Sequence, residues 1–337
     1  MRADRKPPSH VGEPAKASIS FGIAFLLAVF SPAALAAIHV TDDTGRDITL
    51  AHPAQRIISL APNATELLFS AGAGDRIVAT VQYSDYPPPA RTLRRIGGSS
   101  AIDFERVVAL EPDLIVAWAS GNPERLIARL RDLGFPVYRM QSYRLEDIAH
   151  NLVRLGRLAG TESVARVESK RFLARYHALT ARYAGRPPVR VFYQVLDPQL
   201  ITVNGRHVIS QILRLCGGIN VFASLPVLAP VIDEEAVLDA DPEAIIAGGT
   251  EKDWSTWRAH WRRRTAVRAV KRGALYRIPP DLIHRDTVRL LDGAERVCRA
   301  LQDARHRRSA DPAPNPNRVK DRVQAGGIGR HKTSAVP

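Results

Sequence analysis

A short unit of sequence occurs in each half of the chain, and it restricts the fold more than any other feature. Residues 104–116 (FERVVALEPDLIV) and 235–246 (EAVLDADPEAII) both combine an acidic and apolar helical stretch, a proline turn and an apolar run. Proline lacks a backbone N–H and pushes the residue before it towards extended geometry, so the helix ends there and a strand begins at a fixed place. One helix–turn–strand unit used twice predicts two related lobes.

Short apolar runs rich in β-branched residues alternate with helical segments around this unit. The runs that predict strands are residues 56–60, 77–81, 114–118 and 137–140 in the first half, and 189–194, 200–203, 244–247 and 274–278 in the second. Helices are predicted in the second half at 207–216, 234–239, 254–270 and 287–302. This alternation is typical of parallel sheets covered by helices, so the fold class is α/β with a central parallel sheet in each lobe.

A long helix is predicted between the two halves. Residues 161–184 contain no Pro or Gly and carry apolar side chains at near-helical spacing. The helix begins after Gly160 and ends at residues 185–188 (GRPP), which a helix does not cross easily. A single stiff connection limits how far two lobes swing apart, so we expect only small hinge motion. We expect the ligand to bind in a cleft between the two lobes.

The two ends of the chain differ from its body. Residues 1–20 are polar and basic, residues 21–30 form an apolar run too short to span a bilayer, and small residues follow up to Ala36. This pattern predicts a secretory signal cleaved near Ala36 and a periplasmic location. Few large apolar residues occur after position 303, which predicts a disordered tail. The expected domains are a signal peptide at 1–36, lobes at 37–159 and 187–303, a linking helix at 160–186 and a basic tail at 304–337.

The net charge of +14 is concentrated at the ends of the chain. The signal contributes +2 and the tail +6, which leaves +6 for the body. A nucleic-acid partner is therefore not expected, because much of the basicity lies in a removed segment and a solvated tail.

No catalytic or metal-binding constellation is apparent in the sequence. There is no phosphate-binding glycine loop, and the ten histidines are scattered without the spacing that metal sites favour. Three tryptophans (Trp254, Trp257 and Trp261) share one helical face, which predicts a packing stripe rather than a ligand box. These absences favour a binding protein over an enzyme, with no catalytic residues and no metal.

Two cysteines, Cys216 and Cys298, are the only ones in the chain. An oxidising export compartment permits them to form a disulfide, and two buried free thiols are the alternative that the sequence leaves open.

Five segments resemble the periplasmic cobalamin-binding proteins of vitamin importers, within a wider class of receptors for corrinoids, haem and iron-siderophores. The resemblance covers about residues 55–302. Its segments are 58–67 (ISLAPNATEL), 83–88 (YSDYPP), 104–114 (FERVVALEPDL), 117–125 (AWASGNPER) and 215–222 (LCGGINVF). The YSDYPP segment and the two cysteines narrow the resemblance to the cobalamin-binding branch of this class. In that branch a cysteine before Gly-Gly pairs with one in the final helix, which implies a Cys216–Cys298 disulfide.

The resemblance also implies ligand-binding residues. Tyr83 matches an aromatic residue that stacks on the corrin ring, and Asp281 and Arg285 match polar contacts to its amide side chains. Trp118 is a further candidate from its position alone, because it ends a predicted strand, where α/β proteins commonly bind ligands. A place in the core is the alternative that the sequence leaves open for Trp118. The chain departs from the family at positions 99 and 229, where Ser and Ala replace tryptophans, and at positions 201–202, where Ile and Thr lie near a family phenylalanine.

Glu105 and Glu235 occupy corresponding positions in the two repeated units. They match the acids that dock into arginine pockets on a permease dimer, and one acid on each lobe suits a partner with two-fold symmetry. The resemblance implies a monomer that binds a corrinoid reversibly, has no resident cofactor, and meets the inner membrane only through the ABC importer.

Two other functions remain open from the sequence. A haem or iron-siderophore binding protein has the same scaffold, and Tyr83 and His284 offer side chains of the kinds that ligate haem iron. A structural or adhesive envelope protein that uses its basic tail is the alternative of another class, and it predicts no ligand in the cleft.

Overall fold

The structure is a computed structural model that describes residues 9, 12, 37–195 and 199–310. The predicted signal cleavage site and the last part of the predicted tail, residues 311–337, lie outside the described residues. In the part that is described, no helix has the length and apolarity needed to cross a membrane.

The N-terminal lobe contains a four-stranded parallel sheet in the order β4-β3-β5-β6. Its strands are β3 (Ile57–Ser59), β4 (Ile77–Ala79), β5 (Leu114–Trp118) and β6 (Val137–Met140), and its helices are α1 (Pro62–Ser70), α2 (Phe104–Ala109), α3 (Glu124–Asp132) and α4 (Leu145–Leu158). Two 3₁₀ turns, η1 (Gly74–Arg76) and η2 (Pro88–Thr92), flank β4.

The C-terminal lobe repeats this arrangement with the strand order β10-β9-β7-β8, again parallel. Its strands are β7 (Val189–Gln194), β8 (Gly218–Asn220), β9 (Ala244–Gly248) and β10 (Leu275–Ile278). Its helices are α6 (Val208–Leu215), α7 (Glu234–Ala240), α8 (Glu251–Arg262), α9 (Arg268–Lys271), α10 (Pro280–Ile283) and α11 (Leu290–Ala310). In each lobe the first strand pairs with the second and the third, so both sheets have one topology. The predicted α/β fold with two parallel sheets is confirmed.

The repeated unit makes matching hydrogen bonds in the two lobes. After α2, Asp113 accepts from the backbone N–H of Arg56, and the Arg56 side chain donates to the Leu110 carbonyl. After α7, Glu243 accepts from the backbone N–H of Arg190, and the Arg190 side chain donates to the Ala240 carbonyl. The acid after each proline therefore fixes the start of the neighbouring strand.

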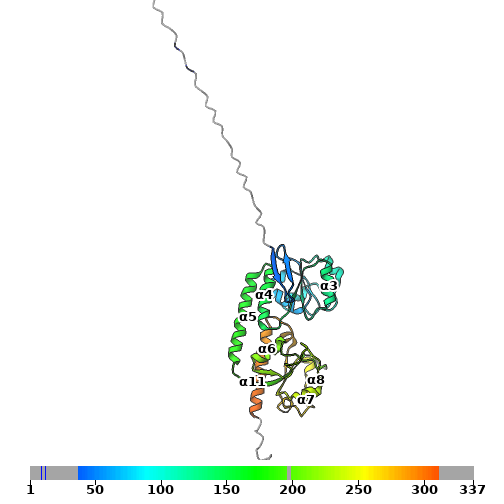
Figure 1. The fold of residues 1–337 in the computed structure, drawn as a ribbon, viewed down its shortest axis with the longest axis vertical. Coiled ribbons are helices and arrows are strands. Elements are labelled where there is room, and N and C mark those ends of the chain that lie inside the picture. Colours follow the sequence, from blue (N-terminus) through cyan, green and yellow to red (C-terminus); the bar gives the residue numbers. More distant parts are fainter. Residues whose placement is uncertain (1–8, 10–11, 13–36, 196–198, 311–337) are drawn as a thin grey trace, which may run out of the picture. The chain divides into compact units, whose positions relative to one another are not determined.

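The predicted linking helix is α5 (Glu162–Tyr183), which packs along α4 (Figure 1). The two helices approach closely at Gly156, where a Cβ atom would lie 2.3 Å from the Cβ of Ala165. Past its midpoint, α5 is tied to α11, because Arg175 forms ion pairs with Asp292 at 2.6 Å and Glu295 at 2.8 Å.

An antiparallel hairpin, β1 (Ile38–Thr41) and β2 (Asp47–Leu50), precedes the first sheet and was not predicted. Its turn lies against the edge strand β6, where the Asp43 N–H donates to the Arg139 carbonyl at 3.0 Å. The Asp43 carboxylate also accepts from the backbone N–H of Gln141 and from the side chain of Arg154. The hairpin therefore occupies hydrogen-bonding groups that an exposed sheet edge would leave unpaired.

Three predicted segments differ from the structure by more than a residue or two. Residues 200–203 form only an isolated bridge between Ile201 and Val231, and the helix predicted at 254–270 is two helices, α8 and α9. The predicted tail begins too early, because α11 continues to Ala310. Arg305 is buried there and donates to the carbonyls of Cys216 and Pro187, at 2.6 and 2.7 Å. Amino-acid composition did not predict this part of the helix, because it does not show that backbone carbonyls are available to Arg305. With such acceptors, an arginine side chain can be buried in the core.

The disulfide between Cys216 and Cys298 is present and fully buried, which confirms the predicted pairing. It joins the C-terminal end of α6 to the middle of α11.

Candidate functional site

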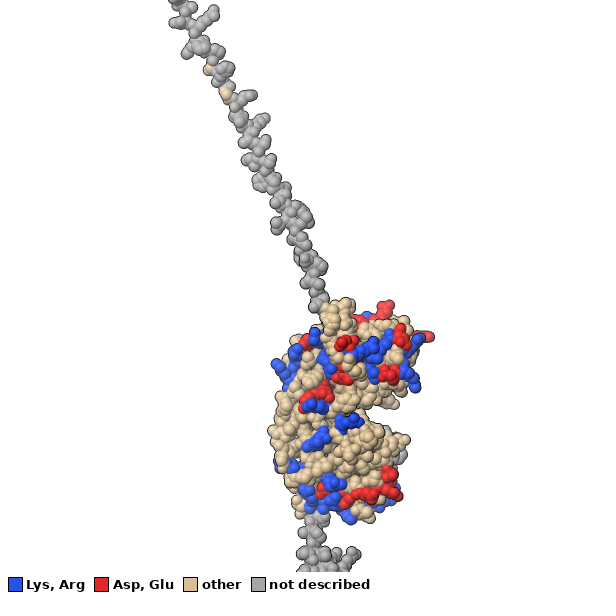
Figure 2. Space-filling view, viewed as in Figure 1, with Lys and Arg blue, Asp and Glu red and all other residues tan. Residues whose placement is uncertain are grey.

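The residues predicted to bind ligand lie at the carboxyl ends of the two sheets. Tyr83 follows β4, Trp118 is the last residue of β5, and Asp281 and Arg285 follow β10. Open parallel sheets bind ligands in the crevice outside these strand ends. The surface is hollowed between the two lobes (Figure 2).

Tyr83 is held with its ring in solvent. Its side chain is 79% exposed and its backbone is left-handed, with φ of 64°. A left-handed conformation is unfavourable for a large side chain and persists only where the surroundings impose it. Here Arg285 donates to the Tyr83 carbonyl at 3.1 Å, and Arg95 donates to the next carbonyl, that of Ser84, at 2.7 Å. The loop is therefore held by hydrogen bonds while its aromatic ring is mostly exposed to solvent.

Arg285 joins the two lobes. Its guanidinium binds Glu66 at 2.8 Å and Asp85 at 3.0 Å in the N-terminal lobe, and Asp281 at 2.9 Å in its own lobe. Burial lowers the pKa of Arg285, but the hydrogen bonds to Glu66 and Asp85 outweigh it and leave the pKa raised. Burial raises the pKa of Asp85, and the hydrogen bond and charge of Arg285 reverse this so that its pKa is lowered. Three of the predicted residues, Tyr83, Asp281 and Arg285, are thus brought together.

Glu66 is the acid at the centre of this cluster, and sequence reasoning missed it. It lies on α1, is 2% exposed, and also accepts two hydrogen bonds from Arg289, at 2.9 and 2.7 Å. The Arg289 guanidinium carbon lies 3.6 Å from the centre of the Tyr86 ring, in a cation–π contact. The available signal was an acid on the apolar helix of the ISLAPNATEL segment, where an unpaired carboxylate is too costly to bury.

Trp118 is not part of this cluster. Its ring is half-buried against Gly121, where a Cβ atom would lie 1.9 Å from the ring. Asn122 accepts from the Trp118 backbone N–H and donates to the carbonyls of Leu60 and Ser99. The indole Nε1 is buried without a hydrogen-bond partner within residues 37–195 and 199–310.

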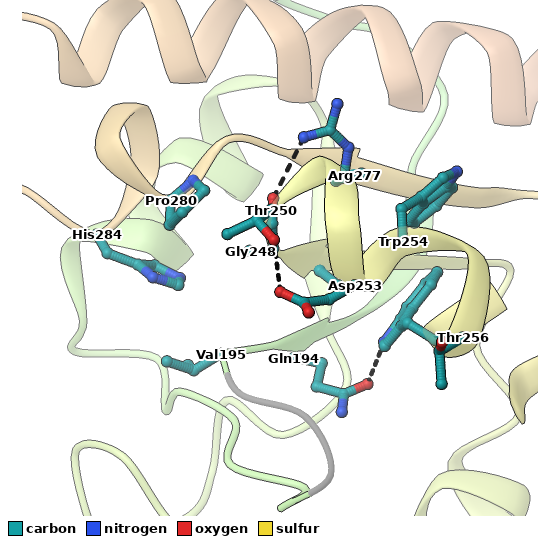
Figure 3. Close-up of a pocket in the computed structure, with 13 residues that line it drawn as sticks. Gln194, Val195, Gly248, Thr250, Asp253, Trp254, Thr256, Arg277, Pro280 and His284 are labelled. Atoms are coloured by element: carbon teal, nitrogen blue, oxygen red, sulfur yellow. Dashed lines mark hydrogen bonds between the residues drawn. The ribbon is translucent and has the colours of Figure 1, made fainter.

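A cavity of about 310 Å³ opens at the carboxyl ends of β7, β9 and β10. Figure 3 shows His284 and Pro280 on one side of it and Trp254 on the other, with Asp253 between them. Pro280 directly precedes Asp281, so the cavity adjoins the predicted ligand-binding residues.

The predicted tryptophan stripe is a packing stripe for two of its members. Trp257 and Trp261 are buried, and both indole N–H groups donate to Gln194 Oε1, at 2.8 and 3.0 Å. Trp254 is half-buried, stacks on Trp257 with ring centres 4.8 Å apart, and lines the cavity.

Two neutral histidines interact with each other, and one of them, His284, lines this cavity. Burial lowers the pKa of His284 to about 4, although Asp281 opposes the shift. Burial and the charge of His284 lower the pKa of His207 to about 4. His284 Nε2 lies 2.8 Å from the hydroxyl of Tyr193, which is fully buried. Across the described residues, no group of three or more His, Cys, Asp or Glu is placed to hold a metal ion.

Glu105 and Glu235 hold equivalent places on the two lobes. Each is the second residue of a short helix, α2 or α7, whose N-cap aspartate accepts a hydrogen bond from a backbone N–H in the first turn. Both side chains are exposed, and among the described residues neither carboxylate has an ion-pair partner.

A sequence model of the periplasmic binding protein family matches residues 57–282. The vitamin B12-binding protein of Vibrio cholerae is 39% identical over 258 residues, which are 75% of this chain and 91% of that protein. The vitamin B12-binding protein of Yersinia pestis is 34% identical over 251 residues, covering 74% and 88%.

Solved structures agree with these matches. The crystal structure of the Vibrio cholerae vitamin B12 binding protein BtuF gives a TM-score of 0.70 at 39% identity, covering 75% of this chain and 98% of that one. A periplasmic heme-binding protein from Roseiflexus shares the fold at 18% identity, with a TM-score of 0.66 and coverage of 74% and 98%. The chain belongs to the periplasmic binding protein family.

Proposed function

We propose that the protein binds cobalamin or a closely related corrinoid and delivers it to an ABC importer. The observation that carries this proposal is the arrangement around Arg285, which fixes the exposed Tyr83 ring beside Asp281 where the two lobes meet. The names of the relatives that are 34–39% identical point to the same ligand.

The arrangement suits a flat ligand rimmed with amides. The Tyr83 ring offers a stacking surface, and Asp281, whose side chain is 53% exposed, offers acceptor oxygens to amide N–H groups. Arg285 reaches the same region while Glu66 and Asp85 hold it in place, so little side-chain entropy remains to be lost on binding.

Delivery is proposed to use Glu105 and Glu235. Each exposed carboxylate projects from the start of a helix, and one on each lobe fits a permease dimer with two-fold symmetry and basic pockets. The protein then acts as a monomer in the periplasm and meets the inner membrane only through its permease. Binding is reversible and uses no resident cofactor, and the cargo undergoes no bond-breaking.

Calorimetry tests this proposal. Residues 37–337 are titrated with cyanocobalamin, haem and a ferric siderophore, and heat is expected with cyanocobalamin. Tyr83→Ala should weaken binding roughly five- to tenfold, because one stacked aromatic contributes about 1 kcal/mol beyond its buried area. Tyr83→Phe keeps the ring and should keep the affinity. The absence of heat with every corrinoid would refute the proposal.

Haem is the second candidate, and the neutral His284 at the cavity favours it, because haem iron is ligated by neutral imidazole. Haem bound through this side chain would give an absorption band that His284→Gln shifts. An unchanged haem spectrum in that variant would remove this candidate.

A further inference from the structure

A second hollow, of about 500 Å³, lies between the two lobes and belongs to neither the cavity nor the Arg285 cluster. Its lining residues are Tyr143 and Arg144 from the N-terminal lobe and Gly205, Arg206, Arg214 and Leu228 from the C-terminal lobe. We call it the arginine hollow.

The arginine hollow has more positive than negative charge. Arg144 pairs with Glu146 at 3.3 Å. Arg206 and Arg214 donate only to backbone carbonyls, Arg206 to Pro226 at 2.7 Å and Arg214 to Gly205 at 3.0 Å, and neither has a carboxylate partner in the part of the chain that is described. These carbonyls orient the guanidinium groups without neutralising them, so further N–H donors remain for an anion.

The walls of the hollow are fixed by contacts on both lobes. Asp147 accepts from the backbone N–H groups of Tyr143 and Arg144, at 3.0 and 2.8 Å. Next to them, the Leu145 N–H donates to Gln211 Oε1 on α6 at 2.7 Å, which joins the lobes beside the hollow. The Tyr143 ring is 51% exposed, so a flat apolar surface accompanies the arginines.

The position of the hollow relates it to the ligand edge. Tyr143 follows β6 and Tyr83 follows β4, and these strands are the two outer members of the first sheet. Three strand spacings separate them, which is about 14 Å. In the second lobe, Arg285 follows β10 and Arg206 lies in the connection between β7 and α6. The exposed Tyr83 ring and the arginines therefore lie at the same edge of the sheets, and a large ligand that follows this edge from Tyr83 would meet the arginines.

We propose that the arginine hollow binds the phosphodiester group of the cargo. This inference rests on the proposed function and adds a recognition element to it. A complete corrinoid carries one phosphate in the loop that links its lower base to the ring, and guanidinium groups bind phosphate oxygens through paired, charge-assisted hydrogen bonds. The hollow distinguishes corrinoids that have this phosphate from those that lack it.

Three ligands separate the phosphate from the rest of the molecule. Cobinamide lacks both phosphate and base, cobinamide phosphate has the phosphate alone, and cyanocobalamin has both. Calorimetry on the wild type should give about tenfold tighter binding of the two phosphate-bearing ligands than of cobinamide. In the Arg206→Gln/Arg214→Gln variant this preference should disappear while the cobinamide affinity stays unchanged.

The matched control is Arg182→Gln/Arg262→Gln, which removes two exposed arginines from helices α5 and α8. It should keep the preference, and thermal unfolding should show that both double variants are folded. An excess of inorganic phosphate should weaken cyanocobalamin binding and leave cobinamide binding alone.

Equal wild-type affinities for cobinamide and cobinamide phosphate would overturn the inference and leave the proposed function standing. The inference is also overturned, and the proposed function stands, if the Arg206→Gln/Arg214→Gln variant weakens the binding of all three ligands equally. Binding of inorganic phosphate that depends on the arginines, without any gain for cobinamide phosphate, would make the hollow a site for a free anion and also overturn the inference. If no corrinoid binds the wild type, the proposed function fails and the inference fails with it.

Discussion

The two lobes share a framework and differ at the edges that face the ligand. Their sheets have one strand order. In both lobes an acid after a proline, Asp113 or Glu243, accepts from a backbone N–H at or directly before the start of the first strand. At the carboxyl edge the N-terminal lobe presents an exposed tyrosine, Tyr83, and the acid Glu66, whereas the C-terminal lobe presents arginines and neutral histidines. The two lobes thus share their backbone arrangement, whereas the side chains that create a site differ between them. Opposite charges on the two carboxyl edges join the lobes.

The strongest way to break this complementarity is to remove Glu66. Glu66→Ala leaves Arg285 and Arg289 without their buried acceptor, and we expect the free energy of unfolding to fall by about 3–5 kcal/mol. Urea unfolding followed by circular dichroism measures it. Replacing all three residues by methionine should recover most of the loss, because buried ion pairs are often replaceable by apolar side chains. A loss below about 1 kcal/mol for Glu66→Ala would show that the lobes do not depend on this cluster.

The disulfide is a feature of the C-terminal lobe alone. Cys216→Ala/Cys298→Ala should lower the free energy of unfolding by about 4 kcal/mol, because the bond closes a long loop with a sequence separation of 82 residues. Urea unfolding without reductant measures this loss. An unfolding curve that matches the wild type would contradict the prediction.

The histidines should make the C-terminal lobe acid-sensitive. The pKa of His284 is about 4 in the folded protein and about 6.5 in the unfolded chain, so the unfolded state gains a proton first as the pH falls below 6.5. The contribution of His284 is therefore lost between pH 6.5 and 4, and it amounts to about 2 kcal/mol from pH 7 to pH 5. The lowered pKa of His207 acts in the same direction. Burial raises the pKa of Asp286 to about 7, which opposes this trend.

His284→Gln isolates the contribution of His284 from those of His207 and Asp286. The stability difference between variant and wild type, measured by urea unfolding at several pH values, should shift in favour of the variant as the pH falls. A difference that does not change with pH would contradict the assignment.

The smallest effects on the isolated protein are expected at Glu105 and Glu235. Each Glu→Gln change should alter the free energy of unfolding by less than about 0.5 kcal/mol and leave ligand affinity unchanged, because both side chains are exposed and unpaired in the described structure. Uptake of labelled cobalamin by cells should fall in each variant to a similar degree. Loss of uptake in only one would show that the lobes are not equivalent in docking.

The sequence predicted those features that depend on backbone pattern. The proline turns, the β-branched runs and the uninterrupted helix of 161–184 located both sheets and α5, because such patterns act locally. The Arg285 cluster was only half predicted. Glu66 is 219 residues away from Arg285 in sequence, and nothing local indicates that a particular helix acid will meet it.

Two other features were missed for related reasons. The hairpin before β3 is bound to the edge strand β6 at Arg139, which lies 97 residues after Asp42 in the sequence. Because this contact is distant in sequence, the short strands of the hairpin could not be recognised from their neighbours. Arg305 was assigned to a solvated tail by its charge, whereas carbonyl acceptors from two distant segments allow its burial.

The course of α11 has a practical consequence. Near its end, Arg308 donates to the carbonyl of Pro188, which immediately precedes β7, so the helix finishes beside the amino ends of the second sheet. Tyr83, Asp281 and the arginine hollow are all at the carboxyl ends. A reporter dye or an immobilisation handle attached directly after Ala310 would therefore begin on the side opposite the cargo, which makes this position suitable for building a corrinoid sensor from the protein.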